Sequence, residues 1–213
     1  MKNNTELLKN SAVEIVKTGI EEIADNTLGK LSFGLFTAAM TARNKLIADK
    51  LIQKLENSKI ELADELIQSN EFLGYTSKIL LALSTSTKQK KFDYLMNVYI
   101  NGISNEYFIN RSDKYSEVID IISSLSEDSI NVMIELHKFY SNEILITDKN
   151  NNPIPYISQK LNMAEADILA TCYLLSGKGL VLQQPLYGSG FAPLQSSWLE
   201  DIIELLEDKT QSM

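Results

Sequence analysis

Apolar residues recur every three or four positions through most of the first 125 residues, which is the spacing of one buried face of an α-helix. The pattern predicts amphipathic helices joined by short polar segments, over residues 5–23, 39–57, a stretch after Ser58, 72–83, 88–103 and 115–125. All four prolines of the chain lie beyond Asn150, so no proline interrupts these helices. The first part of the chain is therefore expected to be an all-helical region.

The helix expected over residues 39–57 has two chemically different faces. Its inward side is expected to hold four apolar residues, Leu46, Ile47, Leu51 and Leu55. The opposite face carries Arg43, Lys50 and Lys54, which are either a solvated surface or a contact patch. The basic segment Arg43-Asn-Lys-Leu-Ile-Ala-Asp-Lys-Leu51, followed by residues 75–99 with lysines at their middle, resembles helical proteins of unknown function that occur beside bacterial phage and mobile-element genes. That resemblance brings no mechanism with it.

The last third of the chain shows a different order of elements. We expect a helix over residues 128–140, a strand over 143–147, a turn, helices over 154–161 and 164–175, strands over 180–184 and 191–195, and a final helix over 198–206. A glycine turn at residues 187–190 separates the last two strands. This order resembles a winged helix, a fold whose third helix often reads DNA.

Local signals complete that prediction. Asn162 and Met163 are expected to form the turn between the second and third helices, Gly177 and Gly179 to supply left-handed residues after the third, and Ser197 to cap the last. The third helix should place four apolar side chains in the core, Ile168, Leu169, Cys172 and Leu175. The fold class is thus mainly α, with an N-terminal multi-helix region (residues 1–125) and a C-terminal winged-helix-like α+β domain (residues 126–213).

Charge argues against DNA as the partner of this C-terminal domain. Residues 125–213 hold 5 Lys and Arg against 12 Asp and Glu, out of a net charge of −8 for the whole chain. The start of the third helix, Ala164-Glu-Ala-Asp-Ile168, presents two carboxylates where DNA readers usually present Arg, Lys, Asn or Gln. Glu165 and Asp167 would repel phosphates. The leading hypothesis is therefore protein–protein contact or self-association, with these two residues in the interface.

A second hypothesis is a nucleic-acid-binding regulator that uses the helical region. Lys78, Lys88, Lys90 and Lys91 form the densest cluster of positive charge in the sequence, and lysines are what a polyanion contact requires. A solvated surface is the simpler interpretation of the cluster. Any nucleic-acid binding by these lysines is expected to be weak, non-specific and dependent on salt.

The sequence offers little catalytic chemistry. The chain has one histidine, His137, and one cysteine, Cys172, each at helical spacing from apolar neighbours. Both are expected to be packing residues, and together they cannot form a typical Cys/His zinc site. Ser176-Gly-Lys-Gly179 lacks the spaced glycine and trailing hydroxyl of a phosphate-binding loop. We therefore expect no enzymatic activity, no cofactor and no metal.

The apolar stretch over residues 31–42, between Lys30 and Arg43, provides a third hypothesis, a membrane-active helical protein. Its length is below the roughly 20 residues of a spanning helix. We therefore expect this stretch to be a buried core helix and do not expect it to associate with a membrane. The polar start of the sequence shows no secretory signal, and a single cysteine suits a reducing compartment. A cytoplasmic location is expected.

Overall fold

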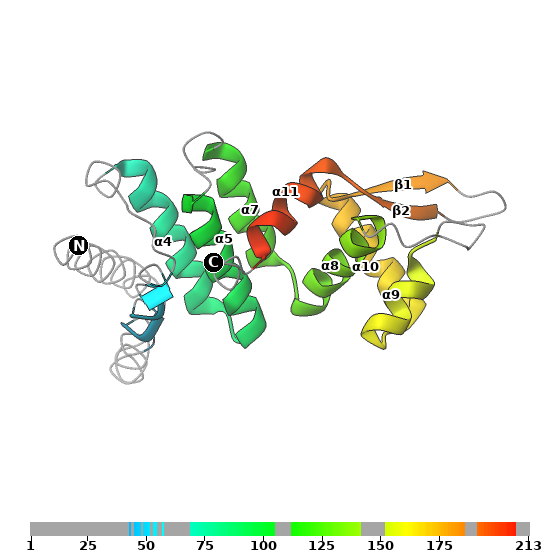
Figure 1. Ribbon diagram of the computed structural model, residues 1–213, viewed down its shortest axis with the longest axis horizontal. Coiled ribbons are helices and arrows are strands. Elements are labelled where there is room, and N and C mark those ends of the chain that lie inside the picture. The colour runs from blue at the N-terminus through cyan, green and yellow to red at the C-terminus, as the bar shows by residue number, and fades with distance from the viewer. Residues whose placement is uncertain are drawn as a thin grey trace, which may run out of the picture. The chain divides into compact units, whose positions relative to one another are not determined.

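The computed structural model describes residues 43, 45–47, 49–51, 53, 54, 57, 69–104, 112–141, 152–185 and 191–207 (Figure 1). These residues are mainly helical, with a small antiparallel sheet of two strands near the C-terminus. Unit 2 is Ser124–Glu207, and unit 1 holds the described residues that precede it. The apolar stretch at residues 31–42, the strand expected over 143–147 and the turn at 187–190 lie outside the described residues.

Among its described residues, unit 1 contains three continuous helices, α4 (Asn70–Thr85), α5 (Gln89–Ser104) and α7 (Ser112–Ser124). Helix α4 begins where the Ser69 side chain accepts a hydrogen bond from the backbone N–H of Phe72, at 3.1 Å. This cap satisfies one of the N–H groups that a helix start leaves unpaired. The three helices lie beside one another in Figure 1, and the described helical residues between Arg43 and Asn57 add a further element.

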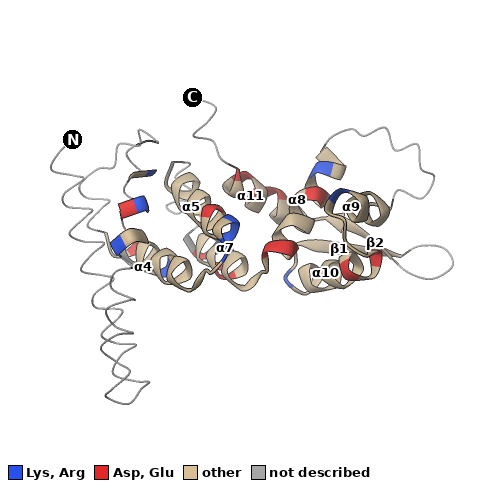
Figure 2. Ribbon diagram, turned by 90° about the horizontal axis from the view of Figure 1, so that it is seen from below, with Lys and Arg blue, Asp and Glu red and all other residues tan. Residues whose placement is uncertain are grey.

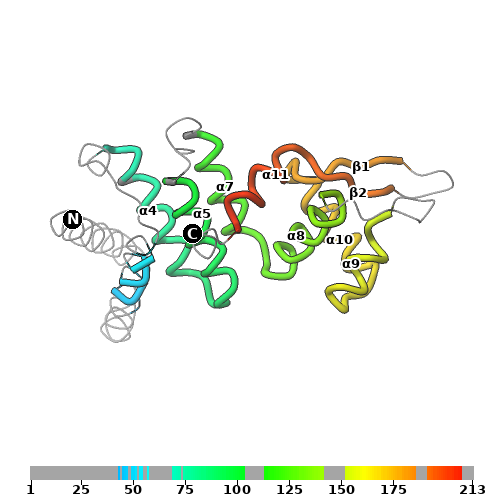
Figure 3. The backbone as a smooth tube through the Cα atoms, in the orientation of Figure 1, coloured from blue at the N-terminus to red at the C-terminus, as the bar shows by residue number. Residues whose placement is uncertain are grey.

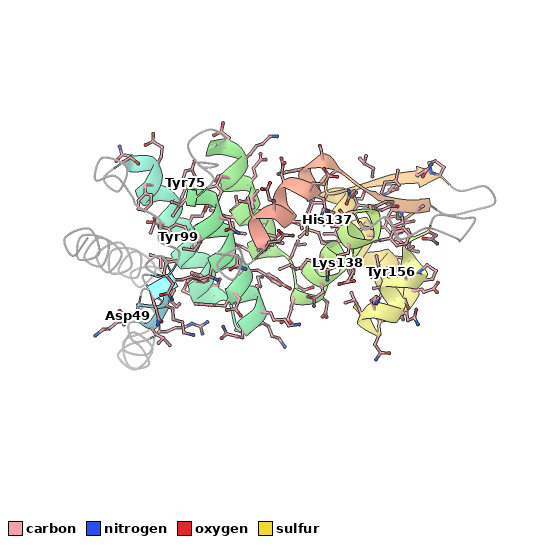
Figure 4. The ribbon with its side chains drawn as sticks, viewed as in Figure 1. Asp49, Tyr75, Tyr99, His137, Lys138 and Tyr156 are labelled. Carbon is pink, nitrogen blue, oxygen red and sulfur yellow. The ribbon has the colours of Figure 1, made fainter. Side chains whose placement is uncertain are left out.

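The core of unit 1 is built from the apolar rows that the sequence predicts, and its most buried side chains include Ile79, Leu83, Leu95, Tyr99, Tyr115, Val118 and Ile122. Two tyrosine hydroxyls enter this core and each has a partner. The Tyr99 hydroxyl lies 2.7 Å from Thr76 Oγ1, and the Tyr115 hydroxyl donates to the carbonyl of Val98 at 3.3 Å. Figure 4 shows Tyr75 and Tyr99 among these helices. Burial raises the pKa of both Tyr99 and Tyr115, so both stay neutral.

The element at residues 43–57 corrects one expectation. Ile47 and Leu51 are buried as predicted, but Leu46 is 56% exposed. Ile47 and Leu51 are four residues apart and share one side of the helix, whereas Leu46 is rotated by about 100° from Ile47. In this helix the buried face is narrow enough that Leu46 falls outside it.

The basic residues of this element contact α5 and the segment that precedes it. Arg43 donates to the carbonyl of Ser86, Lys54 donates to the side chain of Asn97, and the Lys50 ammonium lies 5.1 Å from the centre of the Phe92 ring. Each charge therefore helps to position the helix within unit 1.

Figure 3 traces the backbone of unit 2. Its elements are α8 (Glu127–Ser141), α9 (Ile154–Leu161), α10 (Glu165–Gly177), β1 (Val181–Pro185), β2 (Phe191–Gln195) and α11 (Ser197–Leu206). The two strands pair antiparallel, with Val181 opposite Gln195 and Pro185 opposite Phe191. Helix α10 contacts α8, α9 and β1, and α8 also contacts β2 and α11.

Side chains of α8 and α10 hold the sheet against the helices. The Tyr140 hydroxyl donates to the carbonyl of Pro193 at 2.7 Å, and His137 bonds to the side chain of Gln195 at 3.2 Å. The rings of Tyr173 and Phe191 pack at 4.6 Å between centroids. A two-stranded ribbon is marginal by itself in water, so these contacts fix its position.

The end of α10 is a Schellman motif. Leu180 N–H donates to the carbonyl of Leu175 at 3.0 Å, and Gly179 N–H donates to that of Ser176 at 2.9 Å, the bond pattern that closes a helix through one left-handed residue. Gly179 supplies that residue with a φ of 76°. The expectation of a left-handed Gly177 was wrong: Gly177 is the last residue of α10, because a single left-handed residue completes the motif.

The neighbouring helix ends differ in detail from the prediction. Asn162, with a φ of 52°, ends α9 in the left-handed conformation. The cap of α11 is Ser196, whose side chain accepts from Leu199 N–H at 3.2 Å, and the expectation that Ser197 caps this helix was wrong. A capping side chain bonds to the N–H three residues ahead, and Ser196 stands at that distance from Leu199. The Trp198 ring lies 3.8 Å from the position that a Cβ at Gly179 would take.

We predict that Gly102→Ala destabilises unit 1. A Cβ on Gly102 would lie 2.3 Å from Cε2 of Tyr115, and the Tyr115 ring is fully buried, so it cannot move aside freely. Overpacking of this kind costs about 1–3 kcal/mol. The measurement is urea unfolding followed by far-UV circular dichroism.

Gly74→Ala is the matched control. Gly74 lies inside α4, and a Cβ there meets nothing within 4 Å, so the variant should gain up to about 1 kcal/mol from its better helix propensity. A Gly102→Ala variant that is as stable as wild type would show that α5 and α7 do not approach each other as described.

Candidate functional site

Helix α10 is apolar on two sides, and only one of them is in the core. Ile168, Cys172 and Leu175 are fully buried. The residues exposed on the rest of the helix include four apolar side chains, Ala166, Ala170, Tyr173 and Leu174. These stand at positions i, i+4, i+7 and i+8, which share one face of a helix. We call this face, together with Glu165 and Asp167, the α10 surface.

Tyr173 and Leu174 are the bulky part of this surface. Their exposed fractions are 50% and 48%, and the Tyr173 ring packs, tilted by 57°, against the buried ring of Phe191 at the start of β2. Sequence reasoning missed both residues, although it expected Leu169 to be buried, and that residue is only half-buried. The signal was present: residues 168–175 are apolar except for Thr171, and a helix that is apolar all round is normally covered on every side.

The N-terminal end of the α10 surface is acidic. Glu165 and Asp167 are both exposed and lie in the first turn of α10, where the helix dipole favours negative charge. Neither carboxylate has a hydrogen bond or ion pair within the described part of the chain. The cap residue Ala164 brings no side-chain hydrogen bond. The two charges are therefore available to an external cation.

The surroundings of the α10 surface are also acidic. The described residues of unit 2 contain nine Asp and Glu against three lysines, Lys138, Lys160 and Lys178. Acidic segments lie on α8, α10 and α11 in Figure 2. Lys138 pairs with Glu135 at 2.7 Å, and Lys178 donates to Ser124 at 2.9 Å. Lys178 is thus held near the far end of α10, away from the two carboxylates.

His137 joins α8 to the sheet and to α11. Glu200 can only accept, so the bond at 2.6 Å fixes the Gln195 amide nitrogen as its donor and leaves the amide oxygen to accept from His137 Nδ1. His137 Nε2 is then the acceptor for the hydroxyl of Ser141 at 3.1 Å. Figure 4 shows His137 on α8. All of its partners are neighbouring side chains that organise unit 2.

Cys172 faces the core on the opposite side of α10 from Ala170. Its side chain is fully buried, and burial raises the pKa of its thiol to about 11. A thiol that stays protonated is a poor nucleophile and a poor metal ligand. Among the described residues, no group of three or more His, Cys, Asp or Glu is placed to hold a metal ion.

Two of the four clustered lysines form hydrogen bonds to residues of helix α7. Lys78 donates to Asp120 at 2.7 Å and to the side chain and carbonyl of Ser116. Lys91 donates to the carbonyl of Ser123 at 2.6 Å, one of the last carbonyls of α7, where a positive charge is favourable. Burial lowers the pKa of Lys91. These contacts attach α4 and α5 to α7.

Lys88 and Lys90 are exposed at the start of α5. The lysine cluster of the sequence is thus divided in the structure between two contacts to α7 and two exposed side chains. Sequence proximity could not reveal this division, because Ser116, Asp120 and Ser123 come more than 30 positions later than their lysine partners.

Comparisons with known proteins provide no relative from which to transfer a function. No protein-family model, curated protein or solved structure matches this chain. Within the described ranges, no helix is both long enough and apolar enough to cross a membrane.

We predict that Cys172 is unreactive in the folded chain. Raising the thiol pKa from its usual value of 9.0 to about 11 reduces the thiolate fraction at pH 8 by about 100-fold, and burial also blocks access. A chromogenic disulfide reagent should therefore label native protein at least about 100-fold more slowly than the urea-unfolded chain. Equal rates for the two would contradict the burial of this side of α10.

We also predict that Lys91→Met lowers the stability of unit 1 by about 1 kcal/mol, because it removes a charged donor from the carbonyl of Ser123. Lys88→Met is the matched control. Lys88 is exposed, so its replacement should change stability by less than about 0.5 kcal/mol. Urea unfolding of both variants is the measurement, and equal stabilities would show that the contact of Lys91 with α7 contributes nothing.

Proposed function

We propose that unit 2 is a winged-helix-like domain that works as a protein-interaction module without enzymatic activity, and that the α10 surface is its docking site. The order of the described elements supports the fold: α8, α9 and α10 are followed by an antiparallel pair of strands and α11. In this arrangement α10 takes the place of the third, recognition helix. The left-handed Asn162 makes the short turn before it.

One observation carries the docking role. An exposed apolar row on α10, containing Tyr173 and Leu174, is bordered by two carboxylates without partners in the described chain. Exposed apolar side chains gathered on one surface are typical of interaction sites, whereas single ones are ordinary. Tyrosine in particular contributes large contact area at interfaces.

The same surface is unfavourable for DNA. A recognition helix presents donors to base edges from its N-terminal half, and the N-terminal half of α10 presents Glu165, Ala166 and Asp167. A backbone phosphate near these carboxylates would be repelled, and the described part of unit 2 brings few cations to offset that repulsion. Nucleic-acid binding through unit 1 is also weakly supported, because Lys78 and Lys91 are engaged with α7.

The proposal is tested by a photo-cross-linking residue placed at Ala170 in the full chain, in cells that naturally make the protein. We expect discrete protein adducts from position 170 and none from the same residue at Asp128, which is exposed on α8 of the same unit. The adducts should be lost in a Glu165→Lys/Asp167→Lys variant. Its melting temperature should change little, because exposed charges contribute little to stability and the lost interaction with the helix dipole is only about 0.3–1 kcal/mol per charge.

Glu127→Lys/Asp128→Lys is the matched control for this variant. It reverses two charges in the first turn of α8, so it changes net charge equally at another helix N-terminus. The control should keep the adducts. Only the α10 reversal should raise affinity for DNA, measured by gel shift at low salt. Adducts that persist in the α10 variant, or that form equally from position 128, would contradict docking at this surface.

A further inference from the structure

The shape of the α10 surface selects the kind of backbone that fits it. Ala166 and Ala170 make the N-terminal half of the exposed row shallow, while Tyr173 and Leu174 make the C-terminal half prominent. Packed helices approach to about 8–10 Å between axes, and the distance depends on the side chains at the contact. Two alanines one turn apart permit the close end of that range, so a helix can lie along this row and place its own apolar side chains beside them.

The charges of the α10 surface select the direction of that helix. Glu165 and Asp167 lie at the N-terminal end of the row, and Lys178 lies beyond its C-terminal end, bound to Ser124. A partner should therefore place cations over the N-terminus of α10. Helices favour Lys and Arg in their last turn, so a partner that runs antiparallel to α10 places its favourable basic end at the two carboxylates. The two helix dipoles also favour the antiparallel direction.

A second copy of this chain is a poor occupant. The described part of unit 2 holds nine carboxylates against three lysines, so two copies facing each other would bring like charges together at short range. Lys138 and Lys178 already have partners within the unit. Charge complementarity instead favours a partner that is basic where this surface is acidic.

We infer that the α10 surface binds an amphipathic helix of another protein, antiparallel to α10, with small and apolar side chains along its inner row and Lys or Arg in its last turn. This inference rests on the proposed docking function and adds the chemistry and direction of the partner. Such a helix would bury Tyr173 and Leu174 and pair its cations with Glu165 and Asp167. In this mode of binding, the partner helix makes its contacts through side chains at positions i, i+3, i+4 and i+7.

The test uses the full chain as bait for a displayed library of 20-residue peptides with a helix-forming background. Enriched peptides should share an apolar row at helical spacing and Lys or Arg in the last turn. For each peptide, moving the basic residues to the first turn should weaken binding by about tenfold. Leu174→Ala in the bait should also weaken binding by about tenfold. Glu165→Lys/Asp167→Lys should abolish binding, and Glu127→Lys/Asp128→Lys should preserve it.

The other outcomes separate this inference from the proposed function. Enriched peptides that are acidic or extended but still depend on Leu174 overturn the partner chemistry and leave the docking role intact. Peptides whose binding is unchanged by every α10 substitution overturn both the partner chemistry and the docking role. A library without enrichment counts against the helical partner, while the cross-link from position 170 still decides the docking role. A concentration-dependent dimer in sedimentation that Leu174→Ala dissociates would name a second copy as the occupant and overturn the inference.

Discussion

Two antiparallel strands do not make a stable sheet in water by themselves, and the arrangement of unit 2 follows from this constraint. The strands β1 and β2 need a helical layer on one face, and α8 and α10 provide it through Tyr140, His137 and Tyr173. Helix α10 meets this need with its buried row, in which Ile168, Cys172 and Leu175 enter the core. The other faces of α10 lie at the surface of the unit.

That division of α10 leaves an apolar row exposed, which is the basis of the docking role proposed for this helix. An ordinary surface helix carries polar residues opposite its buried row, but α10 carries Ala166, Ala170, Tyr173 and Leu174 there. Tyr173 also packs against Phe191 of the sheet, but no contact described within unit 2 requires Ala166, Ala170 or Leu174 to be apolar. A requirement that lies outside the chain, namely a binding partner, gives a physical reason for them. Unit 1 differs, because its polar groups are used internally: Thr76 and Tyr99 pair in the core, and Lys78 and Lys91 attach to α7.

Periodicity predicted most of the described helices and the two-stranded sheet, because each depends on local spacing and on turn residues such as Gly179. The helices expected over residues 5–23 and after Ser58 lie outside the described residues. The errors have equally local causes. Ser196 and Ser197 are both competent caps, and only the bond to Leu199 decides between them. Leu46 is apolar but stands one residue from the buried row.

The candidate site was only half predictable. Glu165 and Asp167 were visible as charges of the wrong sign for DNA, but Tyr173 and Leu174 were not singled out from the sequence. Periodicity correctly placed Ile168, Cys172 and Leu175 in the core, but it gave no sign that a second apolar row on the same helix would be exposed. The separation of Lys78 and Lys91 from Lys88 was also hidden, because it depends on α7 partners far along the chain.

The position of Trp198 has a spectroscopic consequence. It is the single tryptophan of the chain and lies in α11 of unit 2, with its ring facing Gly179 and its indole nitrogen shielded from water without a hydrogen-bond partner among the described residues. An indole in such surroundings emits at shorter wavelength than one exposed to water. Tryptophan fluorescence, excited at wavelengths that tyrosine does not absorb, therefore follows unit 2, while the amide circular dichroism sums both units. Comparing the two signals during unfolding distinguishes the loss of one unit from the loss of the other in the intact protein.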